Sequence, residues 1–244
     1  MHRTRSSAVR LIGVVAGLIA VVASCGGDER VVVFAASSLT DVFERLELEF
    51  EAAHPDVDVI VNVAGSSSLV AQLADGAPVD VLVTADQDTM ATAVASTTMA
   101  GDPVVLARNE LVIVVERGNP LAIGSLDDLS DDVVVVLAAP DVPAGAYSRA
   151  VLACAGVDVD PASLEQSVRS VAAKVALGEA DAGLVYRTDV SDDLDAVELP
   201  DACQVTADYP IVVVVDAPAA RRFVEFATGS AGADALSDEG FVLP

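Results

Sequence analysis

The chain has 244 residues, of which 53% are hydrophobic and 4% are aromatic, and its formal net charge is −25. This apolar fraction is far too high for a disordered chain, so we expect a packed core built mainly from Val, Ala and Leu. A nucleic-acid-binding function is disfavoured, because 13 basic residues against 38 acidic ones provide no surface that neutralises phosphates. The length suits one large domain or two smaller lobes.

The first segment has the pattern of an export signal. Arg3, Arg5 and Arg10 precede a 13-residue apolar stretch at 11–23. A membrane-spanning helix needs about 20 residues, so the stretch fits the apolar region of a secretory signal better than a stable anchor.

The apolar stretch ends in the sequence VASCG at 22–26, which is similar to a bacterial lipobox, where the cysteine receives a diacylglyceryl group. We therefore expect residues 1–24 to be a lipoprotein signal peptide and Cys25 to be the lipidated first residue of the mature protein. Residues 25–29 would be a short tether, and the protein would be anchored to the membrane outside the cytoplasm. The alternative is a soluble export signal whose cysteine is incidental.

Two further cysteines remain. In an oxidising compartment Cys154 and Cys203 are candidates for a disulfide. The alternative is two buried thiols, and two lone cysteines predict no metal site.

After the signal, apolar runs typical of strands alternate with helical patterns. The predicted strands are 31–35, 57–63, 79–84, 111–115, 133–138, 182–186 and 211–215. The predicted helices are 39–50, 67–75, one beginning at Asp86, a short one with a capping box at Ser125, 143–155, 168–177, 217–227 and 231–236. This alternation, with nearly all-apolar strands, predicts two α/β lobes whose parallel sheets are covered on both faces.

Ligands in such folds bind where strand ends meet helix N-termini, and two of these junctions are rich in serine. The first turn of a helix has unpaired N–H groups and a partial positive charge, so it can bind an anion without a cationic side chain. Ser38 and Ser66 are the candidate donors, and Ser67 is a rival because the run GSSS permits a shift of one residue. The simpler alternatives are that Ser38 is an N-cap completed by Asp41, and that the second loop is solvated.

Three further donors are predicted in the second half of the chain. Pro143 suits the first position of a helix, which makes Ala144 the next free N–H donor. Ser167 is a candidate N-cap, with Val168 as the first donor of its helix, and Tyr186 ends a strand with a hydroxyl group. The alternatives are ordinary helix starts and a half-buried packing tyrosine.

These segments resemble the periplasmic molybdate-binding proteins of ABC transporters. The similar stretches, in chain order, are FAASSLT (34–40), GAPVD (76–80), TADQ (84–87), VPAG (142–145), GEADAGLVY (178–186) and YPI (209–211). The resemblance runs from Val31 to the end of the chain and implies a two-lobed type II solute-binding protein that closes on tetrahedral molybdate or tungstate. It also implies an ABC permease as partner, no cofactor and a monomeric protein.

The resemblance also implies which groups hold the oxyanion. Ser38 and Ser66 would donate through hydroxyl and backbone N–H, Ala144 and Val168 through N–H only, and Tyr186 through its hydroxyl, with no direct ligand to the metal. Neutral donors of fixed geometry compensate the desolvation of a dianion, and they reject hydrogenphosphate, which must itself donate a proton. Sulfate must be excluded by cavity size.

The expected hinge strands divide the chain into lobes. Lobe 1 would contain 30–109 and 214–244, and lobe 2 would contain 110–213. The strands 111–115 and 211–215 would connect the lobes and allow closure on the ligand.

Two alternative functions are an enzyme and a binding protein for a different anion. His54 is the only histidine after the signal, no cysteine has a histidine partner, and the Gly-x-Ser-x-Gly motif is absent. Scattered acidic residues leave a secreted hydrolase with paired carboxylates as a remote alternative. The nearer alternative is the same fold binding sulfate, phosphate or another small anion. We therefore expect a binding protein with no catalytic residue.

Overall fold

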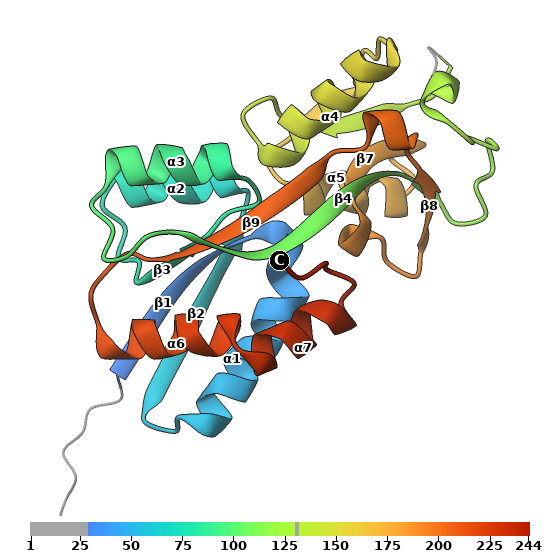
Figure 1. The fold of residues 1–244 in the computed structure, drawn as a ribbon. Helices are drawn as coiled ribbons and strands as arrows, with labels where there is room; N and C mark the ends of the chain where they lie inside the picture. The colour runs from blue at the N-terminus through green and yellow to red at the C-terminus, as the bar shows by residue number, and fades with distance from the viewer. Residues whose placement is uncertain (1–28, 130–131) are drawn as a thin grey trace, which may run out of the picture.

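The computed structural model describes residues 29–129 and 132–244 (Figure 1). The predicted signal peptide, the lipidated Cys25 and most of the tether lie outside the described residues. Among the residues that the structure does describe, none of the helices is both long enough and apolar enough to cross a bilayer.

The order of elements alternates between strands and helices, as the sequence predicts. The strands are β1 (Glu29–Ala36), β2 (Val57–Ala64), β3 (Val81–Val83), β4 (Val104–Glu116), β5 (Val135–Ala138), β6 (Ser163–Glu165), β7 (Ala182–Tyr186), β8 (Leu194–Glu198) and β9 (Thr206–Val213). The α-helices are α1 (Thr40–Ala53), α2 (Ser66–Ala74), α3 (Gln87–Ser96), α4 (Pro143–Ala155), α5 (Val168–Ala176), α6 (Pro218–Thr228) and α7 (Ser230–Asp238). Short 3₁₀ turns are η1 (Ser37–Leu39), η2 (Leu126–Asp128), η3 (Arg187–Asp189) and η4 (Asp201–Cys203).

The strands form a continuous sheet in the order β2-β1-β3-β9-β4-β7-β5-β6, with β8 also paired to β4. Figure 1 shows two lobes, one around β1, β2 and β3 and the other around β5, β7 and β8, with β4 and β9 running between them. The first part of β4 pairs with β9, and its second part pairs with β7 and β8. One long strand therefore belongs to both lobes.

The prediction of parallel sheets is correct only in part. Pairing is parallel for β1 with β2 and β3, and for β5 with β6 and β7. It is antiparallel for β3 with β9 and for β4 with β7, β8 and β9. Because β4 and β9 carry the chain between the lobes in opposite directions, they cannot both be parallel to their neighbours, and an apolar run does not reveal strand direction.

Several element boundaries differ from the prediction. β4 begins at Val104, because 104–110 pairs with β9 and continues as a strand through the polar Arg108 and Asn109. β9 ends at Val213, where the next amide, of Val214, donates to the Asp80 carbonyl instead. β6 and β8 were not predicted, because they are short and largely exposed. In contrast, α4 and β7 have the predicted bounds.

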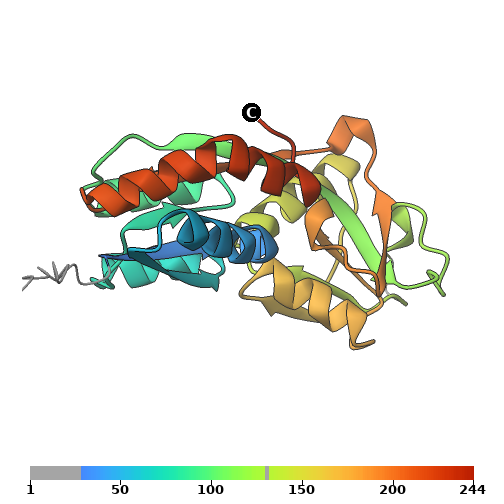
Figure 2. The same ribbon diagram turned by 90° about the horizontal axis from the view of Figure 1, so that it is seen from below.

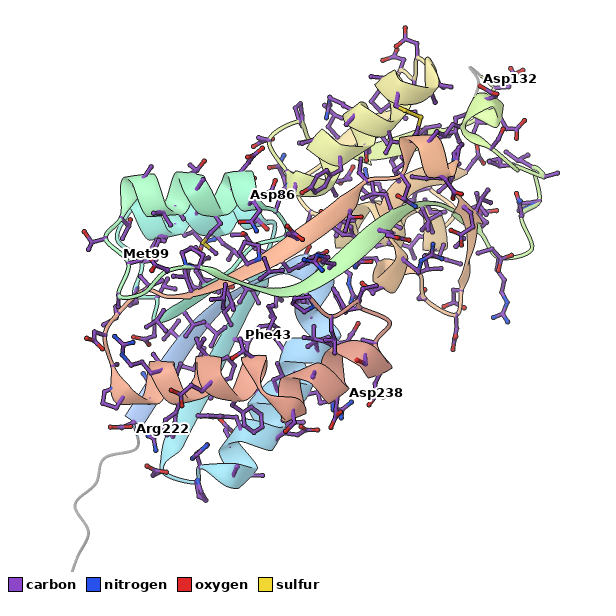
Figure 3. The ribbon with its side chains drawn as sticks, in the orientation of Figure 1. Phe43, Asp86, Met99, Asp132, Arg222 and Asp238 are labelled. Atoms are coloured by element: carbon purple, nitrogen blue, oxygen red, sulfur yellow. A yellow bond between two sulfur atoms is a disulfide. The ribbon has the colours of Figure 1, made fainter. Side chains whose placement is uncertain are left out.

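Helices cover both faces of the sheet in lobe 1, as Figures 1 and 2 show for α2 and α3 on one side and α1 and α6 on the other. Alternate residues of β1 point to opposite faces. Phe34 packs in the cluster beneath α2 and α3, whereas Val33 and Ala35 belong to the larger core. Phe43 of α1 points into this larger core in Figure 3.

Cys154 near the end of α4 and Cys203 of η4 form a disulfide with an S–S distance of 2.00 Å and a Cα–Cα distance of 5.6 Å. The bridge ties a helix of the second lobe to the segment that leads into β9. It therefore constrains one end of a strand that runs between the lobes.

Candidate functional site

A small cavity lies between the lobes, and all five predicted donors line it. Its lining residues are Ala36, Ser37, Ser38, Gly65, Ser66, Ala85, Val142, Pro143, Ala144, Val168 and Tyr186. The water-accessible volume is about 10 Å³, close to what a single water molecule requires. The lining contains no charged side chain. The structure thus brings residues from 36 to 186 together around one neutral cavity.

Ser38 lines the cavity on the side of lobe 1. It lies in η1, between β1 and α1, and is 3% exposed. The alternative that Ser38 is an N-cap completed by Asp41 is wrong, because the N-cap of α1 is Leu39 and no side chain caps this helix. Instead, Ser38 Oγ lies 2.9 Å from Tyr209 Oη. The 3₁₀ turn moves the helix start one residue along and releases Ser38 from a capping role.

Ser66 is the second contribution from lobe 1. It is the first residue of α2, and its Oγ accepts a hydrogen bond of 3.0 Å from the Ala85 amide. Its own O–H remains able to donate. The rival Ser67 is absent from the lining, and its hydroxyl donates to the Asp141 carbonyl.

Gly65, which precedes Ser66, lies against the backbone of Gln166 in the second lobe. A Cβ atom built on Gly65 would lie 2.1 Å from the Gln166 carbonyl oxygen, so a larger residue there would push the lobes apart.

Two helix N-termini line the cavity from lobe 2. Pro143 occupies the first turn of α4, followed by Ala144, and Ser167 caps α5 by accepting a 3.2 Å hydrogen bond from the Ser170 amide. Val168 is then the first residue of α5. First-turn amides have no partner within their helix, so α2, α4 and α5 all present N–H groups and positive dipole ends to one space.

Tyr186 completes the cavity at the end of β7. The residue is 1% exposed, and its Oη has no hydrogen-bond partner among the described residues. Burial raises the pKa of Tyr186 well above its ordinary value, so the phenol remains protonated and is a hydrogen-bond donor. A buried hydroxyl without a partner costs about 1–3 kcal/mol, which points to a ligand as its partner.

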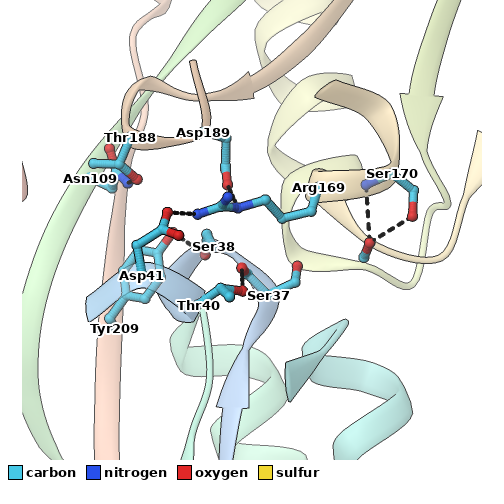
Figure 4. A network of polar contacts seen from close by, with 11 residues as sticks. Ser37, Ser38, Thr40, Asp41, Asn109, Arg169, Ser170, Thr188, Asp189 and Tyr209 are labelled. Carbon is cyan, nitrogen blue, oxygen red and sulfur yellow. Dashed lines mark hydrogen bonds and ion pairs between the residues drawn. The ribbon is translucent and has the colours of Figure 1, made fainter. Parts of the chain in front are cut away.

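A charged cluster lies beside the cavity and does not line it. We call it the Arg169 cluster: Arg169 of α5 pairs with Asp41 of α1 and, at 2.9 Å between Nε and Oδ1, with Asp189 of η3 (Figure 4). The N–H of Arg169 is poorly aligned with this oxygen, so the contact is not a strong hydrogen bond, and it is an ion pair where Asp189 is ionised. Burial raises the pKa of Asp189 to about 7, although Arg169 opposes this shift.

The sequence alone does not predict this cluster. Arg169 follows the candidate donor Val168 in the sequence, but 128 residues separate it from Asp41. No local pattern indicates that such residues meet, and only the packing of α5 against η1 and η3 brings them together.

His54 does not line the cavity. His54 caps the C-terminus of α1, and its ring lies 4.4 Å from that of Phe50, measured between centroids. Within 29–129 and 132–244, no three His, Cys, Asp or Glu side chains gather in a way that could hold a metal ion.

Comparisons with known proteins agree with this architecture. A family model described as bacterial extracellular solute-binding protein matches residues 31–242. The molybdate-binding protein ModA of Mycobacterium tuberculosis H37Rv is 40% identical over 225 residues, which cover 89% of this chain and 86% of that protein. ModA of Escherichia coli K12 is 29% identical over 92% of this chain and 93% of its own length.

Solved structures show the same fold at lower identity. The periplasmic molybdate-binding protein of Azotobacter vinelandii has a TM-score of 0.75 at 18% identity, with 88% of this chain and 99% of that chain covered. The sulfate-binding protein SubI of M. tuberculosis has a TM-score of 0.77 at 18% identity, with 87% and 86% covered. These relatives are described as binding proteins, in agreement with the expectation that the chain is not an enzyme. This chain belongs to the family of bacterial extracellular solute-binding proteins.

Proposed function

We propose that this protein captures molybdate or tungstate outside the cytoplasm and delivers it, as a monomer, to the permease of an ABC importer. The single observation that carries the proposal is the buried Tyr186 hydroxyl, which has no partner among the described residues and lines a cavity with Ser38 and Ser66. The 40% identity to the M. tuberculosis molybdate-binding protein supports the choice of ligand.

The chemistry of the cavity suits a fully deprotonated oxyanion. The polar side chains of its lining are hydroxyls, which can donate a hydrogen bond, and the first turns of α2, α4 and α5 add N–H donors. Such donors compensate the lost hydration of a dianion, while a protonated anion would have to donate a proton toward other donors. Sulfate has the charge and shape of molybdate but shorter bonds, so the spacing of the donors must discriminate between them.

Closure of the two lobes is the second part of the proposal. Ser38 and Ser66 would belong to lobe 1 (30–109 and 214–244), whereas Ala144, Val168 and Tyr186 would belong to lobe 2 (110–213). An ion bonded to both sets would favour the closed arrangement, with β4 and β9 bending between the lobes. We expect the radius of gyration in solution scattering to decrease when molybdate is added; an unchanged radius would contradict closure.

The third part is the membrane anchor at Cys25, which rests on the sequence VASCG at 22–26. Lipidation would hold the protein at the membrane surface, because each buried methylene contributes about 0.8 kcal/mol. Expressed in a bacterial host, the full chain should partition into the detergent phase in Triton X-114 extraction, and Cys25→Ser should move it to the aqueous phase. Aqueous partitioning of both proteins would refute the anchor.

Calorimetric titration with molybdate, tungstate, sulfate and phosphate tests the ligand. We expect one site that binds molybdate and tungstate much more tightly than sulfate, with phosphate weakest. Tyr186→Phe removes a hydrogen bond to a charged group and should weaken molybdate binding roughly 10-fold or more. Tyr147→Phe is the matched control, because Tyr147 does not line the cavity. Tighter binding of sulfate than of molybdate would establish the alternative function, and no binding of any anion would refute both.

A further inference from the structure

Tyr209 stands directly behind the cavity and does not line it. It lies on β9, is 0% exposed, and its Oη is 2.9 Å from Ser38 Oγ. The ring packs edge-on against Tyr186 and Phe241, with centroid distances of 5.6 and 5.4 Å. Figure 4 shows Tyr209 and Ser38 side by side near the Arg169 cluster. The phenol is thus fixed in place by packing, with its hydroxyl turned toward a candidate donor to the ligand.

The direction of this hydrogen bond follows from the number of protons. A serine hydroxyl carries one proton, so if Ser38 donates to an oxyanion its oxygen can only accept from Tyr209. Tyr209 is able to donate, because burial raises the pKa of its phenol well above the ordinary value and keeps it protonated. The bonds then run from Tyr209 to Ser38 and from Ser38 to the ligand.

The opposite direction is unfavourable. A protonated anion that donates to Ser38 would turn the Ser38 proton toward Tyr209. The Tyr209 proton would then need another acceptor. Its other polar neighbour is Asn109, whose Nδ2 donates to Thr188 Oγ1 and whose Oδ1 already accepts from the Glu110 amide. A buried hydroxyl proton without a full acceptor of its own is unfavourable, so this direction is disfavoured.

We propose that Tyr209 is a positioning residue that holds Ser38 as a hydrogen-bond donor, so that the cavity selects oxyanions without protons over protonated ones. This inference rests on the proposed function, since it requires Ser38 to contact the bound oxyanion. It adds a specificity-determining group from β9, a strand that runs between the lobes.

A double-mutant cycle on the purified protein tests the inference. Tyr209→Phe keeps the ring and its aromatic contacts and removes only the hydroxyl, so the variant should fold. We expect it to weaken molybdate binding about 5-fold, the value of one hydrogen bond. In the Ser38→Ala background the same substitution should have no further effect, because Tyr209 acts through Ser38. Tyr147→Phe should leave the affinity unchanged in both backgrounds.

A second readout separates positioning from a general loss of rigidity. In Tyr209→Phe, Ser38 becomes free to accept, so the ratio of phosphate to molybdate affinity at pH 7.5 should rise about 5-fold or more relative to wild type. A merely structural role would weaken both anions equally and leave this ratio unchanged. Additive losses in the cycle, or an unchanged ratio, would overturn the inference while wild-type binding of molybdate still stands. Failure of the wild type to bind any of the oxyanions would instead refute the proposed function.

Discussion

The neutral cavity and the Arg169 cluster are adjacent, yet they differ in the charge of the groups that form them. Val168 lines the cavity and Arg169, the next residue of α5, belongs to the cluster. The cavity offers only uncharged donors, whereas the cluster places one cation between two carboxylates. Both regions connect the lobes, since each contains residues from both sides of the molecule.

The difference indicates how a binding protein can bind one anion without also binding many other anions. A free guanidinium beside the cavity would bind many carboxylates and phosphates in bidentate fashion. Here Asp41 and Asp189 occupy the Arg169 side chain. Under the proposed function, recognition is left to amides and hydroxyls whose positions are fixed by helix starts, and these would respond to the size and protonation of the ligand.

The largest expected effect concerns the cluster and appears as a pH dependence of stability. The folded pKa of Asp189, about 7, is above its unfolded value of about 3.9. The folded protein therefore retains this proton between these values. The contribution to stability is full below pH of about 4 and is lost as the pH rises to about 7, with a slope of up to about 1.4 kcal/mol per pH unit.

Asp189→Asn should remove this dependence. Chemical denaturation from pH 4 to 8 should show the free energy of unfolding of wild type falling relative to that of the variant, by a few kcal/mol in total. Other acidic groups, including Asp86, whose pKa burial also raises, contribute to both proteins and cancel in the difference. Parallel curves for the two proteins would show that Asp189 is ionised over this whole pH range. The cluster would then be fully charged beside a neutral cavity.

The next effect tests the backbone donors of the cavity. Val168→Pro removes one N–H at the first position of α5, where proline is tolerated, and Ser167 already has the extended backbone (φ −152°, ψ 155°) that precedes proline. Loss of a hydrogen bond to a dianion should cost about 2 kcal/mol, or roughly 30-fold in affinity.

Val168→Ala is the matched control, because it shortens the side chain but keeps the N–H. Titration calorimetry should find it close to wild type. Equal losses in the two variants would mean that the Val168 side chain, and not its amide, supports binding.

A smaller effect should distinguish the two candidate serines. Ser66→Ala removes a cavity hydroxyl that also accepts from the Ala85 amide, and we expect a loss of about 1 kcal/mol, roughly 5-fold in affinity. Ser67→Ala leaves the cavity lining intact and should bind molybdate almost as wild type does. The reverse order of affinities would shift the assignment by one residue.

The limits of sequence analysis follow from the same two regions. Pro143 and Ser167 mark helix starts through local chemistry, so the cavity residues at 144 and 168 were predictable. Ser38 and Tyr209 are 171 positions apart in the sequence. Their contact could not be predicted, because Ser38 has the local pattern of an N-cap. The directions of β4 and β9 could not be predicted either, because they depend on the pairing partners and not on strand composition.

The smallest expected effect concerns the contact between Arg169 and Asp41, which joins α5 to α1 across the lobes. Both side chains are partly exposed, 34% and 50%, so Asp41→Asn should cost only about 0.5 kcal/mol, or roughly 2-fold in molybdate affinity. If the lobes close on the ligand as proposed, this pair forms only in the closed arrangement. Its loss should then favour the open arrangement and appear as faster release of molybdate in stopped-flow measurements.

Varying the ionic strength provides a control for this prediction. Screening weakens an exposed pair, so the difference between wild type and Asp41→Asn should shrink as ionic strength rises from 0.01 to about 1 M. Glu49→Gln breaks a pair with Arg45 that lies within α1, and it should leave release unchanged at every salt concentration. If Glu49→Gln accelerates release as much as Asp41→Asn does, the effect comes from the net charge of the protein, and the cluster has no separate role in holding the lobes together.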